Sequence, residues 1–256
     1  MINITPIPAF TDNYIWLISH SQRAWVVDPG DAQPVLNYLQ QNNLTLAGIL
    51  LTHYHFDHIG GVNKLLSNAQ VPVYGNPQKI SQVTEASNEG DKIKLENIEL
   101  EVIAVPGHTL DHIAYFGHIP EQGPCLFCGD TLFSAGCGRL FEGTPEQMLR
   151  SLEKLKQLPV ETKVFCAHEY TLANLAFARE VMPESQHVQQ RLTECEQSRA
   201  QHQPTLPARL GDELRYNPFL MADDDQVINA ASQRLKAKPA NETEVFATIR
   251  QWKDSF

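Results

Sequence analysis

A cluster of four metal-competent side chains, His53-Tyr54-His55-Phe56-Asp57-His58, directly follows the apolar run Leu46 to Leu51. The run predicts a buried strand, so the cluster should lie on the loop where that strand ends. In extended backbone the first two histidines point to the same side, while the aspartate and the last histidine precede the helix-compatible segment Ile59 to Ser67 and can turn toward a second point. The stretch therefore predicts two metal ions, bound by imidazole and carboxylate without a thiolate.

Three further candidate ligands occur where apolar, strand-like segments end, namely His108, Asp130 and His168. The carboxyl ends of strands are where α/β sheets place their functional loops. A single His is more often a partly buried polar side chain, but five histidines and two aspartates in such positions favour a metal centre. If Asp130 bridges two ions, room remains for a bridging water, and catalytic sites, unlike structural ones, keep such an open position.

The sequence around these residues resembles the metallo-β-lactamase superfamily. The pattern H-x-H-x-D-H is followed by Gly60-Gly61 and by the motifs Pro106-Gly107-His108-Thr109, Cys128-Gly129-Asp130-Thr131-Leu132-Phe133 and Ala167-His168-Glu169-Tyr170-Thr171. Within the superfamily the chain is most similar to the glyoxalase II (hydroxyacylglutathione hydrolase) family. The features typical of that branch are Gly136-Cys137-Gly138-Arg139, Asn174 and Arg250-Gln251-Trp252-Lys253. The resemblance spans essentially the whole chain.

The resemblance implies that two divalent ions are bound. One ion is held by His53, His55 and His108, the other by Asp57, His58 and His168, and Asp130 bridges them. The two aspartates are implied to act in catalysis through the metal-bound hydroxide. Zinc is the expected metal, with iron and manganese as alternatives, because His and Asp ligands accept all three.

The resemblance also implies the substrate, a thioester of S-(2-hydroxyacyl)glutathione, typically S-D-lactoylglutathione. A metal-bridged hydroxide attacks the carbonyl, and the thiol, with a pKa of about 8.5, leaves readily. The products are glutathione and D-lactate, in the second step of methylglyoxal detoxification. The implied substrate contacts come from Arg139, Phe141, Tyr170, Asn174, Arg250 and Lys253.

Four positions depart from the family's pattern. Tyr54 stands where another His is common, and Asp111 stands where Gly is common before His112. Arg139 and Phe141 stand where some members have Lys and Tyr. The cationic contact is therefore retained at position 139, whereas a hydroxyl contact from position 141 is lost.

Charge and cysteine usage exclude several partners. The 256-residue chain has a net charge of −10 and no visible basic face, which argues against nucleic acid and the nuclease branch of the superfamily. Neither a signal peptide nor a membrane span is indicated. Five cysteines fit reduced thiols, and Cys125-Leu126-Phe127-Cys128 is predicted to be buried rather than a redox pair. We expect a cytoplasmic monomer that acts on a small molecule.

The order of the segments predicts an α/β fold with two domains. Residues 1–170 alternate strands and helices, with a hairpin (14–19 and 24–28), further strands (93–105 and 112–116) and helices (35–41 and 145–155). From residue 171 the predicted elements are helices only (172–181, 188–200 and 242–252). The resemblance specifies an αββα metallo-β-lactamase sandwich for the catalytic domain, 1–170, and a smaller helical substrate-binding domain, 171–256.

Three alternative functions remain at this point. A β-lactamase or lactonase of the same fold would share the metal site but lack the Arg250 and Lys253 pair. An iron persulfide dioxygenase would use one redox-active ion, and a metal-storage or electron-carrier module would bind metal without turnover. The remaining histidines without partners at ligand spacing are predicted to be structural or on the surface: His20, His118, His187 and His202.

Overall fold

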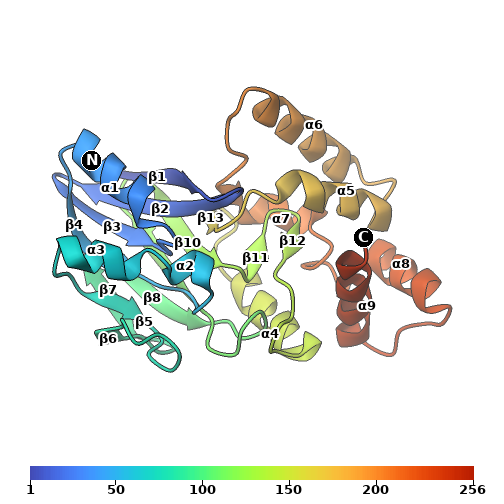
Figure 1. Ribbon diagram of the computed structural model, residues 1–256. Coiled ribbons are helices and arrows are strands. Elements are labelled where there is room, and N and C mark those ends of the chain that lie inside the picture. Colours follow the sequence, from blue (N-terminus) through green and yellow to red (C-terminus); the bar gives the residue numbers. More distant parts are fainter. The chain divides into compact units, whose positions relative to one another are not determined.

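The computed structural model describes residues 1–256 and divides into two compact units (Figure 1). The first unit comprises Met1–Ala104, Asp111–Gly129 and Phe165–His168. The second comprises Val105–Leu110, Asp130–Val164 and Glu169–Phe256. Each unit is thus assembled from segments that are far apart in the sequence. None of the helices has the length and apolar character needed to cross a membrane.

The first unit contains two β-sheets. In the first sheet β1 (Ile2–Ala9), β2 (Asn13–His20) and β3 (Arg23–Val27) are antiparallel, and β4 (Thr45–Leu50), β5 (Val73–Gly75) and β6 (Glu85–Ala86) continue it in parallel. The second sheet is an antiparallel run of β7 (Lys92–Leu95), β8 (Ile98–Ala104), β9 (Ile113–Ile119) and β10 (Gly123–Gly129), with β13 (Lys163–Cys166) beside β10. The predicted hairpin of β2 and β3 is confirmed.

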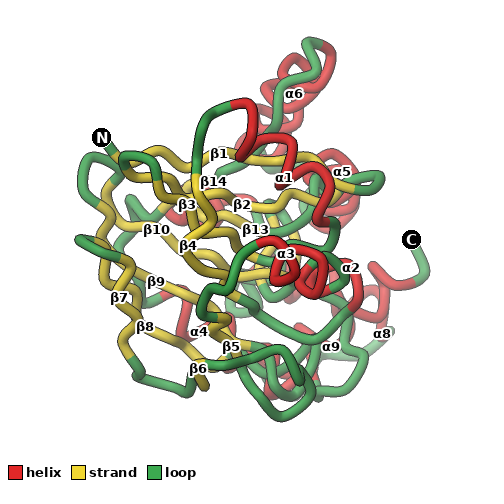
Figure 2. The backbone as a smooth tube through the Cα atoms, turned by 60° about the vertical axis from the view of Figure 1, so that its left-hand side comes forward, coloured by secondary structure: helices red, strands yellow, loops and turns green.

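Helices cover one face of the first sheet (Figures 1 and 2). They are α1 (Ala32–Gln41), α2 (Phe56–Ile59) and α3 (Val62–Asn68). The carboxylate of Asp31 accepts a hydrogen bond from the backbone N–H of Gln33, which satisfies a free donor at the start of α1. Val35 and Leu39 face the strands in a common core with β1 to β4, and this burial of apolar surface stabilises the layer.

The two sheets meet through aromatic side chains. The rings of Trp16 and Phe165 lie edge to face with centroids 4.9 Å apart, and Trp16 Nε1 donates to the carbonyl oxygen of Cys166 at 2.9 Å. The indole thus buries its ring while its single donor stays satisfied. Cys125 and Cys128 are buried free thiols in β10, as predicted.

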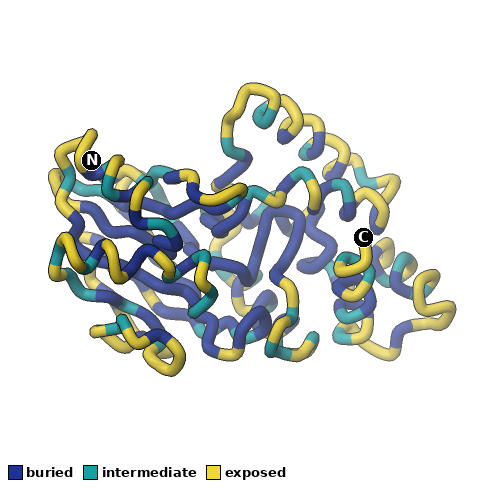
Figure 3. The backbone as a smooth tube through the Cα atoms, viewed as in Figure 1, coloured by how far each residue is buried: buried dark blue, intermediate teal, exposed yellow.

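The second unit is mainly helical. It contains α4 (Pro145–Lys156), α5 (Thr171–Val181), α6 (Gln186–Ala200), α7 (Leu210–Tyr216), α8 (Asp225–Leu235) and α9 (Glu242–Asp254), and the hairpin of β11 (Leu132–Phe133) and β12 (Gly136–Cys137). The predicted helix at 145–155 is confirmed as α4, and Thr144 caps it in a capping box with Gln147. Most residues of α6 are exposed to solvent (Figure 3).

One prediction for the C-terminal third was wrong. The two-residue strand β14 (Ala208–Arg209) pairs with Lys163 and Val164, although no strand was expected there. Two residues are too few to show a period-two pattern, so tertiary pairing alone creates this strand. The predicted layered α/β fold, two packed sheets followed by a helical C-terminal region, is otherwise confirmed.

Candidate metal-binding residues and substrate cavity

The loop after β4 brings the first predicted ligands together. His53 Nε2 and His55 Nδ1 lie 3.1 Å apart. His53 Nδ1 lies 3.1 Å from Thr52 Oγ1, which turns its Nε2 toward His55. Asp57 and His58 lie inside the one-turn helix α2, earlier than the predicted helix. Helical backbone there places the His58 ring against the His53 ring, with centroids 4.1 Å apart.

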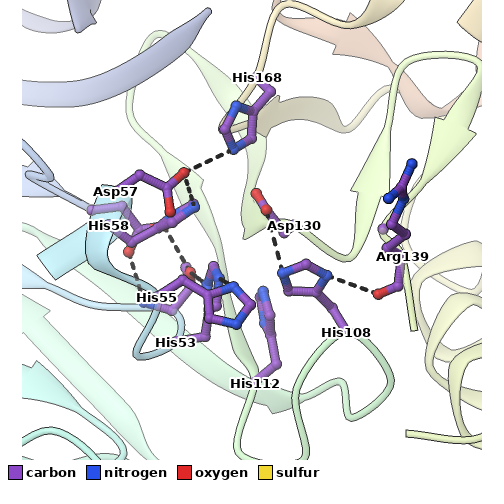
Figure 4. A network of polar contacts seen from close by, with 12 residues as sticks. His53, His55, Asp57, His58, His108, His112, Asp130, Arg139 and His168 are labelled. Carbon is purple, nitrogen blue, oxygen red and sulfur yellow. Dashed lines mark hydrogen bonds and ion pairs between the residues drawn. The ribbon is translucent and has the colours of Figure 1, made fainter. Parts of the chain in front are cut away.

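Asp57, His58 and His168 form a three-residue cluster in the first unit, with ligand atoms within 4.8 Å of one another (Figure 4). The Nε2 atoms of both histidines are 3.4 Å from Asp57 Oδ2. This separation exceeds the usual N–H···O distance of about 2.9–3.0 Å. It matches the ~3.3 Å expected between two ligands that lie ~2.0–2.1 Å from a tetrahedral zinc ion. The cluster therefore fits a divalent cation.

A carboxylate orients each imidazole of the cluster. His58 Nδ1 donates to Asp28 Oδ2 at 3.0 Å, and His168 Nδ1 donates to Asp12 Oδ1 at 2.8 Å. These bonds select the tautomer in which Nε2 has no proton, the form that binds a metal. Asp28 also accepts hydrogen bonds from the backbone N–H and the hydroxyl of Thr52, at 2.8 and 2.7 Å. Asp28 is therefore a support for His58 rather than a further ligand.

Asp57 is held in its ionised form. Burial raises the pKa of this carboxyl, but its polar neighbours His168, His58 and Asn13 outweigh burial and hold the pKa well below its ordinary value. Asn13 Nδ2 also donates to Asp57 Oδ2, at 3.0 Å. A carboxylate must be ionised to bind a cation, so these contacts prepare Asp57 as a ligand. Gly30 is required beside it, because a Cβ there would lie 1.8 Å from the Asp57 carbonyl oxygen.

The sequence did not identify several residues that support the cluster. Asp28 directly follows the apolar segment 24–27, just as Asp130 follows an apolar segment. It was nevertheless predicted to be part of the strand 24–28 and not a candidate site residue. Asp12 carries no signal, because backbone pairing between residues distant in sequence, Asn13 with His168 and Tyr14 with Ala167, brings its turn near the cluster. No role was predicted for His112. Its ring stacks on the His53 ring, with centroids 4.6 Å apart and planes inclined by 16°.

The second unit holds the remaining predicted ligands, His108 and Asp130. His108 Nε2 lies 3.4 Å from Asp130 Oδ2, the separation already seen around Asp57 (Figure 4). His108 Nδ1 donates to the carbonyl oxygen of Arg139 at 2.8 Å. The second unit thus repeats the arrangement of the first, with Nδ1 anchored and Nε2 near a carboxylate.

A cavity of about 490 Å³ adjoins these two ligands in the second unit. Small-molecule sites usually have roughly 300–1,000 Å³. His108 and Asp130 line the cavity, as does Asp254. Its lining also includes every residue predicted to bind substrate: Arg139, Phe141, Tyr170, Asn174, Arg250 and Lys253. The cavity therefore combines candidate metal ligands with a group of cations and aromatic rings.

The positively charged side chains that line the cavity differ in solvent exposure and in how fully they are hydrogen-bonded. Arg250 is 5% exposed, and its Nη1 and Nη2 donate to the Cys137 carbonyl oxygen at 2.8 Å and to Asp254 at 3.1 Å. The Arg139 side chain is 60% exposed. Lys253 Nζ donates to a backbone carbonyl oxygen at 3.2 Å, and burial, with Arg250 and Arg139 nearby, lowers its pKa. Arg139 and Lys253 are thus freer than Arg250 to meet an incoming anion.

Each uncharged residue predicted to bind substrate contacts a neighbouring group of the protein. Asn174 Nδ2 donates to the carbonyl oxygen of Ser134 at 3.0 Å, so this amide supports the hairpin of β11 and β12. Tyr170 packs edge to face on Phe133 at a centroid distance of 5.3 Å. Phe141 is 62% exposed and contacts the His108 ring in the same manner at 5.2 Å.

The buried carboxylate of Glu213 holds the same hairpin. It accepts hydrogen bonds, each of 2.7 Å, from the Ser134 hydroxyl, the Ala135 backbone N–H and the Tyr216 hydroxyl. Asn217 Nδ2 also donates to it, at 3.1 Å. These bonds connect α7 to the segment that carries Phe133 and Cys137 into the cavity wall.

Glu213→Ala should lower the free energy of unfolding by about 2–4 kcal/mol, because several buried donors lose their acceptor. Asp223→Ala, a loss of an exposed carboxylate in the same unit, should stay within about 0.5 kcal/mol. Denaturant unfolding of the parent and both variants measures this difference. Equal stability of the two variants would show that Glu213 does not hold the hairpin.

Comparisons with known proteins agree with this geometry. Residues 9–168 match the family model described as metallo-beta-lactamase superfamily, and residues 169–256 match hydroxyacylglutathione hydrolase C-terminus. A hydroxyacylglutathione hydrolase of Hahella chejuensis is 59% identical over the full length of both chains. A hydroxyacylglutathione hydrolase of Vibrio campbellii is 50% identical, also over the full length of both.

Solved structures show the same fold. ETHE1 from Myxococcus xanthus superposes with a TM-score of 0.67 at 22% identity, covering 98% of this chain and 91% of its own. TTHA1623, solved in a di-iron-bound form, has a TM-score of 0.56 at 28% identity, covering 64% of this chain and 91% of its own. With full-length identities of 50–59% to named relatives, the chain belongs to the hydroxyacylglutathione hydrolase (glyoxalase II) family of the metallo-β-lactamase superfamily.

Proposed function

We propose that this protein is a metal-dependent hydrolase that cleaves the thioester of S-(2-hydroxyacyl)glutathione, with S-D-lactoylglutathione as the typical substrate. The products would be glutathione and a 2-hydroxy acid such as D-lactate, as in the second step of methylglyoxal detoxification. Family membership supports the reaction class. The observation that carries the proposal is the cavity, which His108 and Asp130 line together with Arg139 and Lys253.

The proposed metal ligands are those predicted from the sequence. Their donor set, five imidazoles and two carboxylates, suits two divalent cations, and zinc, iron and manganese all accept such ligands. Three Nε2–Oδ2 separations of 3.4 Å support this assignment. One ion would bind His53, His55 and His108, the other Asp57, His58 and His168, with Asp130 shared.

Bound cations would supply a low pKa for the attacking water and positive charge for the carbonyl oxygen. The protein's own side chains would position the attacking water and limit the access of solvent. Asp57 and Asp130 would hold that water by accepting its hydrogen bonds at their carboxylate oxygens. Phe141, mostly exposed beside His108, would cover the reacting carbon and limit access of bulk water. A thiolate leaves without prior protonation, because its conjugate acid has a pKa of about 8.5.

The glutathione moiety would bind at the cationic side of the cavity. Two carboxylates of the tripeptide would meet Arg139 and Lys253, whose heads are less engaged than that of Arg250. Arg250 would act mainly by holding the β12 backbone through the Cys137 carbonyl oxygen. Tyr170 and Asn174 would shape the wall beside these charges.

Lys253→Ala should raise the Michaelis constant for S-D-lactoylglutathione by roughly 10-fold or more, because a hydrogen bond to a charged group contributes about 1.5–3 kcal/mol. The contact is remote from the thioester carbonyl, so kcat should change little. Lys238→Ala removes an exposed Lys outside this cavity and should leave both constants unchanged. Steady-state kinetics with a small thioester that lacks the tripeptide should not distinguish Lys253→Ala from the parent. A normal Michaelis constant in Lys253→Ala would contradict this binding mode.

We also propose that the protein works as a monomer in the cytoplasm. All proposed site residues come from one chain, so no second copy is needed. All five cysteines are free and buried, which fits a reducing compartment.

The reaction class is tested by a comparison of substrates. The parent protein should hydrolyse S-D-lactoylglutathione much faster than a penicillin, a lactone or a thioester without the tripeptide. Oxygen should not be consumed with glutathione persulfide. Preferred turnover of the penicillin or the persulfide would assign the chain to another activity of the same fold.

A further inference from the structure

Asp254 is the one acidic side chain among the cations at the charged side of the cavity. It is the last residue of α9 and lines the cavity with Arg139, Arg250 and Lys253. Its Oδ1 accepts from Arg250 Nη2 at 3.1 Å and lies 3.4 Å from Arg139 Nε. The Asp254 side chain is 39% exposed. One carboxylate oxygen thus lies between two guanidinium groups, at a place that solvent and ligands can reach.

The position of Asp254 is unfavourable for the helix itself. The C-terminal end of a helix carries partial negative charge, so an acidic residue in the last turn is repelled there, while a basic residue such as Lys253 is favoured. The two guanidinium groups offset this repulsion. The Asp254 carboxylate is therefore held in place by two cations that line the cavity.

The charge pattern of the cavity fits a second role for this carboxylate. At neutral pH the glutathione moiety carries two carboxylates and one α-ammonium group, which belongs to its γ-glutamyl residue. An ammonium group placed among Arg139, Arg250 and Lys253 would be repelled unless an anion lay beside it. Both contacts of Asp254 with guanidinium groups use Oδ1, so Oδ2 keeps its capacity to accept hydrogen bonds.

We propose that Asp254 recognises the α-ammonium group of the substrate and thereby selects thioesters that carry a γ-glutamyl residue. The proposal rests on the proposed function, because it assumes that the thiol part of the substrate is glutathione. Asp254 then has two roles at its two oxygens. Oδ1 holds the guanidinium groups, and Oδ2 binds the ammonium group.

The test compares two ligands that need no turnover. S-methylglutathione and its deaminated analogue, with glutaryl in place of γ-glutamyl, differ only by the α-ammonium group. Isothermal titration of the metal-loaded parent should give a dissociation constant roughly 5- to 20-fold lower for S-methylglutathione than for the deaminated analogue. The factor is smaller than for a buried ion pair, because the Asp254 carboxylate is partly exposed to solvent. Asp254→Asn should bind the two ligands equally, and Asp254→Glu should restore part of the preference.

Asp223→Asn is the matched control, since it removes an exposed carboxylate outside the cavity and should keep the parent's preference. A parent that binds both ligands equally, or binds neither, overturns the proposal. If Asp254→Asn weakens both ligands alike and retains the preference, Asp254 only positions Arg139 and Arg250, and the proposal is likewise overturned. Failure of the proposed function would appear separately, as absence of thioester hydrolysis by a parent that still discriminates between the two ligands.

Discussion

Asp130→Ala should lose one of two bound metal ions per chain and at least ~10³-fold of its turnover of S-D-lactoylglutathione. Asp130 is the one carboxylate that the ligand assignment shares between both ions. It directly follows β10, and its Oδ2 lies 3.4 Å from His108 Nε2. Removing a shared ligand would leave one cation short of donors, and the carboxylate proposed to hold the attacking water would be lost.

Metal analysis of the purified variant, together with its kcat, measures both losses. Asp212→Ala changes an aspartate of the second unit that lies outside the cavity, and it should keep two ions and full turnover. An Asp130→Ala variant that retains two ions and normal turnover would show that Asp130 is not shared.

His58→Ala and His168→Ala should each lower turnover by roughly 10³-fold, while His118→Ala should stay within about threefold of the parent. The first two are buried, and Asp28 and Asp12 orient them toward Asp57. His118 is exposed on β9 and belongs to none of the clusters with ligand geometry. The three substitutions remove the same chemical group from different environments.

The measurement is kcat with metal content for each variant under identical loading. Thermal unfolding of each variant should accompany it, to separate loss of ligand from loss of structure. An equal loss of turnover in His118→Ala would mean that the ligand set is wrong.

Much of the candidate site could be predicted because strand ends are visible in the sequence. His108, Asp130 and His168 each follow an apolar segment, and the structure places each of them at or shortly after the end of a strand: β8, β10 and β13. The dense stretch 53–58 needed no tertiary information, since its ligands are neighbours in the chain. Thr144 likewise caps α4, which begins at residue 145 as the sequence indicates.

The supporting contacts could not be predicted, because they join residues that are distant in sequence. Asp12 reaches His168 across 156 positions, and no local pattern marks it. No local pattern marks Glu213 either, yet its carboxylate is buried against the loop of the β11–β12 hairpin. Arg250 was expected to contact substrate, and only the structure shows that its terminal nitrogens are already engaged by Cys137 and Asp254.

We expect two cations, held by these histidines and aspartates, to be required for hydrolysis of a glutathione thioester. The most direct test removes the metal with a chelator, counts metal per chain, and follows turnover of S-D-lactoylglutathione during stepwise return of zinc, iron or manganese. The metal-free protein should lose nearly all turnover, and recovery should be complete at about two ions per chain. Full turnover without metal, or full recovery at one ion per chain, would contradict this expectation.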